Sequence, residues 1–172
     1  MSKPYADFND ITFGVELETN RPNEVEGRIG GYHNGVTVPW APRTSTGYSR
    51  KRWTAERDGS IHGTPSGHTG CEYVSPIMKG EKGLENLLAF VELLKERNHK
   101  VNRSCGVHIH LGLTSIVGAN ASPDDVVAFL AQLNKYVFNW QDALFGQTGT
   151  RRGEMTYSAR MREGEHMVER IK

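Results

Sequence analysis

Residues 104–112, Ser-Cys-Gly-Val-His-Ile-His-Leu-Gly, alternate with a period of two, the pattern of a strand that buries one face. Successive side chains of a strand point to opposite faces, so His108 and His110 share one face and the apolar side chains share the other. The apolar residues are Val107, Ile109 and Leu111. Gly106 and Gly112 leave space around the imidazoles, as a bound ligand requires. The stretch predicts a sheet with an apolar back and two histidines on its front.

Residues 11–18, Ile-Thr-Phe-Gly-Val-Glu-Leu-Glu, repeat this pattern with carboxylates, since Glu16 and Glu18 share a face with Gly14. Exposed antiparallel faces are polar in any case, so the glutamate pair alone is better explained as solvated side chains. The histidine pair alone fits an ordinary polar face and a ligand site equally well. Two strands with apolar backs and Glu or His fronts together predict a metal-centred site, with Mg, Mn and Zn all compatible.

Two segments carry the apolar period of an amphipathic helix, at 81–97 and at 123–145. Ser122 can cap the second of these helices, proline suits its first turn, and Gly146 ends it. Strands with cleanly alternating faces and two such helices predict an α+β fold, in which a mainly antiparallel sheet has helices on its apolar face.

The remaining segments are short strands or loops. Short strands are expected at 52–57 and 71–75, with a flexible connection at 62–70. Residues 20–50 are rich in Gly, Pro, Asn, Ser and Thr and are expected to form a long loop or insertion. Residues 147–172 form a polar tail.

The composition excludes several classes of partner. The formal net charge is +1 and the basic clusters are short, so neither a nucleic acid nor a membrane surface is expected as a partner. No apolar run reaches the roughly 18 residues of a membrane span. The two cysteines make no disulfide framework and the N-terminus has no secretory apolar segment, so a cytoplasmic location is expected. A Walker-type glycine loop is absent from the sequence, so a bound nucleotide would be held by metals and arginines.

Three other residues leave alternatives open. Asp58, in Asp-Gly-Ser, is by default a turn residue. Glu72 lies at the start of a short strand, and the sequence does not fix which face of the sheet its side chain is on. Cys105 has the opposite strand parity from the two histidines, so a Cys/His nucleophilic pair is not expected.

Four short motifs follow one another along the chain. They are Phe-Gly-Val-Glu-Leu-Glu at 13–18, Asp-Gly-Ser-Ile at 58–61, Glu-Tyr-Val-Ser-Pro at 72–76 and Cys-Gly-Val-His-Ile-His-Leu-Gly at 105–112. Each is weak alone, but the four in this order resemble the amidoligase family, carboxylate–amine ligases related to glutamine synthetase and glutamate–cysteine ligase. The similarity spans about residues 11–160. It implies a glutamine synthetase-like catalytic fold, with a curved antiparallel sheet whose concave face binds ATP through Mg or Mn.

The resemblance also implies a set of metal ligands. Glu16 and His108 would help to hold one ion, and Glu18 and Glu72 another.

Further roles follow from the same resemblance. His110 would lie next to the nucleotide or the acyl substrate, and Asp58 would orient the substrate or a neighbouring group. Arg151 and Arg152 would serve as substrate or phosphate arginines, with Arg152 contacting the nucleotide. Together these four residues form the expected catalytic and cofactor-binding set.

The implied reaction is ATP-dependent formation of an amide or peptide-like bond through an acyl phosphate. Its substrates would be small-molecule or peptide carboxylates and amines. Relatives carry later strands with another metal-binding acid and an arginine, so residues 1–172 are expected to form a single, C-terminally short domain. Either these residues are a fragment, or another chain or a homo-oligomer completes the site, or ligase activity has been lost. The alternatives are a catalytically inactive binding module on the same fold and a metal-dependent hydrolase with a His-x-His site.

Overall fold

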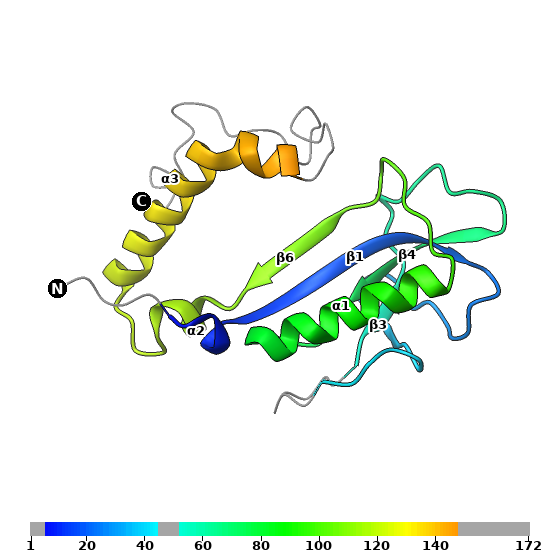
Figure 1. The fold of residues 1–172 in the computed structure, drawn as a ribbon, viewed down its shortest axis with the longest axis horizontal. Helices are drawn as coiled ribbons and strands as arrows, with labels where there is room; N and C mark the ends of the chain where they lie inside the picture. Colours follow the sequence, from blue (N-terminus) through cyan, green and yellow to red (C-terminus); the bar gives the residue numbers. More distant parts are fainter. Residues whose placement is uncertain (1–5, 45–51, 148–172) are drawn as a thin grey trace. The chain divides into compact units, whose positions relative to one another are not determined.

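The computed structural model describes residues 6–44 and 52–147 (Figure 1). Contacts divide the chain into two compact units, Met1–Ile116 and Val117–Lys172. The first unit contains the whole sheet. The predicted α+β class with an antiparallel sheet is confirmed. The curved, glutamine synthetase-like form of this sheet stays a prediction.

The sheet is built around its longest strand, β1. Its strands are β1 (Thr12–Pro22), β2 (Val36–Thr37), β3 (Thr54–Glu56), β4 (His68–Val74), β5 (Met78–Lys79) and β6 (Val107–Leu111). One edge of β1 pairs with β4, which leads to β3 and β2, and also with the short β5. The strand β6 pairs with the other edge of β1. The central strand β1 therefore has β4 and β5 along one edge and β6 along the other. Every named strand pair is antiparallel.

Helices follow the predicted segments closely. The helical elements are η1 (Phe8–Asp10), α1 (Gly80–Glu96), α2 (Leu113–Val117) and α3 (Pro123–Gln147). At the start of α3, the Ser122 hydroxyl oxygen accepts a hydrogen bond from the Asp125 backbone N–H at 3.2 Å, so the predicted cap is present. Within the described ranges, no helix is both long and apolar enough to cross a membrane.

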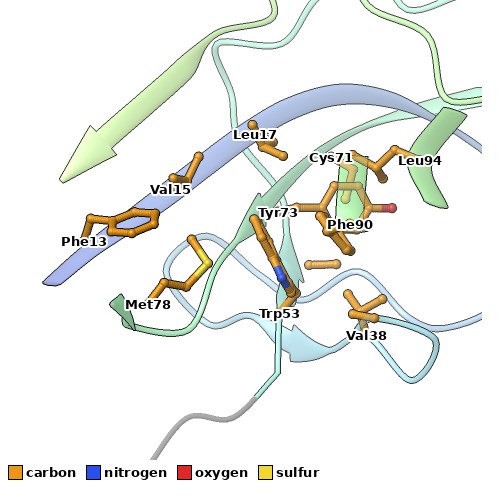
Figure 2. Close-up of a cluster of buried hydrophobic side chains, with 12 residues drawn as sticks. Phe13, Val15, Leu17, Val38, Trp53, Cys71, Tyr73, Met78, Phe90 and Leu94 are labelled. Carbon is orange, nitrogen blue, oxygen red and sulfur yellow. The ribbon is translucent and has the colours of Figure 1, made fainter. Parts of the chain in front are cut away.

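An aromatic core joins α1 to the apolar face of the sheet (Figure 2). Phe90 of α1 stacks on Trp53 with ring centroids 4.0 Å apart and meets Tyr73 edge-on at 5.3 Å. All three side chains are fully buried. The residues that β1 contributes to this core are Phe13, Val15 and Leu17. Because alternate residues of β1 are buried here, its remaining side chains are directed to the opposite face.

His99 belongs to this core rather than to a site. Its Nδ1 donates to the Leu94 carbonyl at 3.1 Å, and its Nε2 accepts from the Tyr73 hydroxyl at 2.8 Å. Burial lowers the pKa of His99 to about 4, so a neutral imidazole ties the end of α1 to β4.

Two strand boundaries differ from the sequence prediction. The strand β1 continues to Pro22, into the segment expected to be loop, and β4 begins at His68, inside the expected flexible connection. These extensions pair with each other, from Asn20 opposite Gly70 to Pro22 opposite His68. Each supplies the other's backbone partners, so polar residues without a strand-like pattern are held in the sheet.

The apolar back of β6 is also different from the prediction. Val107, Ile109 and Leu111 are 64%, 66% and 52% exposed, although they continue the core-facing row of β1. The reason is position: β6 pairs only with β1 among the described strands, whereas α1 packs against β5 on the other side of β1. The alternation was correctly identified, but this part of the apolar face is not buried.

Replacing Phe90 with alanine should destabilise the first unit strongly, because it empties the centre of the aromatic core. The expected loss is about 3–5 kcal/mol in the free energy of unfolding, measured by urea denaturation. Leu88→Ala is the matched control on the same helix, because Leu88 is 56% exposed, and it should cost about 0.5 kcal/mol or less. Equal losses in the two variants would contradict this description of the core.

Candidate metal centre

Polar side chains line the face of β1 that lies opposite the aromatic core. Glu16 stands opposite His108 of β6, and Glu18 stands opposite Glu72 of β4. Glu72 in turn stands opposite Glu56 of β3. Directly opposed residues of antiparallel strands lie on the same face, so the register alone gathers four glutamates and a histidine.

The histidines of β6 are hydrogen-bonded to one carboxylate. His108 Nδ1 lies 3.0 Å from Glu16 Oε2, and His110 Nε2 lies 3.2 Å from Glu16 Oε1. Burial alone would raise the pKa of Glu16, but hydrogen bonds and charge from both histidines outweigh it and lower this pKa. If Nδ1 carries the His108 proton, the lone pair remains on Nε2, 4.0 Å from Glu18 Oε1, where it is free to bind a cation.

Glu18 lies deeper in the sheet and is only 6% exposed. Its Oε2 accepts the backbone N–H of Gly106, and its Oε1 accepts the Ser60 hydroxyl at 3.3 Å. Gly106 is the residue immediately before β6, so the same strand that carries the histidines also fixes the orientation of this buried carboxylate.

Asp58 enters the site through a turn. Its Oδ1 accepts the backbone N–H of Ser60 at 2.6 Å, which is the side-chain-to-backbone bond of an Asx turn. The loop after this turn is tied to the segment before β6, where Asn102 Nδ2 donates to the carbonyls of His62 and Gly63 at 2.9 and 3.2 Å. The turn predicted by default is present, and it also brings a carboxylate to the site.

Glu72 lies at the centre of these groups and is 5% exposed. Burial, followed by the negative charges of Glu16, Asp58, Glu56 and Glu18, raises its pKa to about 7. The shift therefore reflects the burial of Glu72 first and the negative charge of its neighbours second.

Two groups of side chains have ligand atoms close enough to hold a cation. One group is Glu16, Glu72 and His108, and the other is Glu18, Asp58 and Glu72, with ligand atoms within 4.8 Å of one another in each. Glu72 belongs to both groups. This arrangement resembles the two ion sites expected from the sequence, with Asp58 added as a third carboxylate in one of them.

The donor chemistry fits a hard divalent cation. Carboxylate oxygens outnumber nitrogens, a set that suits Mg or Mn, whereas zinc centres favour several His or Cys ligands. Of the histidines that the structure describes, only His108 belongs to one of the ligand groups. His110 instead lies against Glu16. Arg151 and Arg152 lie outside the described residues.

The sequence analysis missed Glu56. This residue is 6% exposed, and its Oε1 lies 3.8 Å from His33 Nδ1. Two residues before it, Thr54 Oγ1 is buried and has no hydrogen-bond partner in the part of the chain that the structure describes. The available signal was the alternation of the strand expected at 52–57, which puts Glu56 and Thr54 on the face opposite Trp53 and Ala55.

Comparison with known proteins places the chain in a family. Residues 9–144 match the family described as "Putative amidoligase enzyme". The match covers well over half of the chain, so this protein belongs to the amidoligase family, as the four motifs predicted. Comparisons with curated proteins and with solved structures gave no match.

Replacing Glu72 with glutamine should weaken Mn²⁺ binding at both ligand groups, because this residue is shared between them. The expected loss is at least about tenfold, since even changes outside the ligand shell cost that much. Glu16→Gln should affect one group only. Isothermal titration calorimetry measures both, with the exposed Glu85→Gln on α1 as the control of equal charge change. Unchanged Mn²⁺ affinity in Glu72→Gln would contradict the proposed centre.

The raised pKa of Glu72 also predicts a pH dependence of stability in metal-free protein. The folded carboxyl keeps its proton up to about pH 7, whereas the unfolded one releases it near pH 4.5. The Glu72 contribution to stability therefore falls as the pH rises from 4.5 to 7. In thermal denaturation, the stability of Glu72→Gln relative to the wild type should rise between pH 4.5 and 7. Above pH 7 this difference should stay constant. A constant difference over the whole interval would show that this carboxyl titrates normally.

Proposed function

We propose that this protein is an ATP-dependent carboxylate–amine ligase that forms an amide or peptide-like bond through an acyl phosphate. The observation that carries the proposal is the pair of carboxylate-rich ligand groups sharing Glu72, in a chain of the amidoligase family. ATP with Mg²⁺ or Mn²⁺, when bound, would supply the phosphoryl group and neutralise the charge that develops on it.

The described residues support this chemistry through their charge and position. Glu16, Glu18, Glu72, Asp58 and His108 would hold the cations, at the face where these carboxylates lie close together. Their negative charge would repel a nucleotide that arrived without metal ions. Nucleotide binding would therefore depend on divalent cations.

His110 would contact the nucleotide or the acyl substrate. Its side chain is 63% exposed and is held at one nitrogen by Glu16. An imidazole fixed in this way has its other nitrogen available as a hydrogen-bond partner for a ligand. Arg151 and Arg152 would add positive charge near the transferring group, as the family resemblance implies.

A hydrolase with a zinc-binding His-x-His pair is the less supported alternative. Both imidazoles lie against the same glutamate, and one of them belongs to no ligand group in the described part of the chain. Metal preference separates the two functions, because the ligase requires Mg or Mn and the hydrolase zinc.

ATP binding to the full chain tests the proposal before any substrate is known. Calorimetry should detect ATP with saturating Mg²⁺ and little binding in excess chelator. Glu16→Ala should reduce the metal-dependent binding about tenfold or more, the scale of a lost charge-assisted contact. ATP binding at full strength in chelator would rule out the proposed mode.

Turnover is then measured as phosphate release with pools of carboxylates and amines. Activity should need both pools, ATP and Mg²⁺, and should be lost in Glu16→Ala and retained in Asp10→Asn, an exposed acid paired with Lys79. Metal-dependent ATP binding without phosphate release under any combination would favour the inactive binding module.

A further inference from the structure

A cavity lies near the end of β1, and the charge of its lining differs from that of the carboxylate face. Its volume is about 330 Å³, at the lower end of the range for small-ligand sites. Three arginines line it: Arg21 in β1, Arg28 in the loop after β1, and Arg57 directly after β3. Strand alternation puts Arg21 on the face opposite Glu18. Aspartate and glutamate are both absent from the described lining.

Arg21 is buried and has no counter-ion within the described ranges of the chain. It is 6% exposed, and its Nη2 donates to the backbone carbonyls of Val25 and Gly27, the latter at 2.7 Å. Its Nε is buried and finds no acceptor among the same residues. A buried guanidinium is costly unless a negative charge compensates it, and two carbonyl dipoles supply only part of that compensation.

The other two arginines are exposed and also lack a counter-ion. The side chains of Arg28 and Arg57 make no ion pair or hydrogen bond among residues 6–44 and 52–147. Glu24 and Glu26, in the same loop as Arg28, pair with neither. The backbone N–H of Arg57 donates to the Gly30 carbonyl at 3.2 Å, which fixes the start of this side chain beside the loop.

We propose that this cavity binds a small oxyanion of the phosphate class. Three positive charges that line one cavity repel one another, and an anion between them removes this cost. The planar fork of each guanidinium matches two oxygens of a phosphate, so three forks can bind such a group from several sides. A phosphate dianion matches the charge of this lining better than a monocarboxylate does.

The cavity and the proposed ligase centre share no residue. The charge of the cavity lining has the opposite sign, and none of its residues is a candidate metal ligand. Free phosphate and the phosphate group of a larger metabolite share this chemistry.

Calorimetry on the full chain in chelator tests the proposal, because metal-dependent phosphate binding at the carboxylate face is then suppressed. The ligands are inorganic phosphate, glycerol 3-phosphate and acetate. Saturable binding of phosphate or the monoester, with acetate much weaker, supports the proposal, and the tighter of the two identifies the source. Equal binding of acetate, or no saturable binding of either phosphate, overturns it.

Variants then locate the binding. Arg28→Gln and Arg57→Gln should each weaken phosphate about tenfold, as expected for the loss of a charge-assisted contact. Both residues are exposed, so the fold should not depend on them. Arg43→Gln is the matched control, an exposed arginine outside this cavity. Arg21→Lys keeps the charge but removes the fork and should also bind weakly. Full affinity in both glutamine variants would place the ligand elsewhere and overturn the proposal.

Discussion

Repulsion between neighbouring carboxylates is the constraint on which the rest of this structure depends. Glu18, Glu72 and Glu56 occupy one row across three adjacent strands, and each is nearly buried. Like charges directly opposite each other destabilise a sheet. A backbone N–H donates to Glu18 and two histidines lie against Glu16, whereas burial and then the charges of these neighbours raise the pKa of Glu72. Either a proton or a cation can neutralise the Glu72 carboxylate, which links stability, pH and ligand binding at one residue.

The sequence indicated which polar residues share a strand face better than it indicated the extent of the sheet around them. The period-two pattern shows which residues of a strand share a face, so the pairs Glu16 with Glu18 and His108 with His110 could be recognised directly. Their meeting requires β1 and β6 to be neighbours although they lie about 90 residues apart in sequence, and the matching alternation of the two strands indicated this before the family resemblance did. Glu56 lies in the strand expected at 52–57, but nothing in the sequence indicated that this strand pairs with β4 and places Glu56 opposite Glu72.

Burial was harder to predict than alternation, because it depends on what packs against a strand. The apolar residues of β1 and β6 have the same pattern, yet Val15 is 2% exposed and its neighbour Ile109 is 66% exposed. Similarly, His68 to Gly70 look like loop residues, and only pairing with the end of β1 makes them a strand. Local propensity cannot reveal either effect, since both are set by distant segments.

The two imidazoles and the carboxylates are carried by strands that differ in local stability. The glutamates are carried by inner strands of the sheet, whereas His108 and His110 are carried by β6, whose backbone pairs on one side only within the described sheet (Figure 1). Outer strands open by local fluctuation far more often than inner ones, and their amide hydrogens exchange with solvent sooner. A cation held by both strands would close that opening. Binding of the cation to His108 would therefore hold β6 against β1. Cation binding and the local opening of β6 would then be linked in one equilibrium.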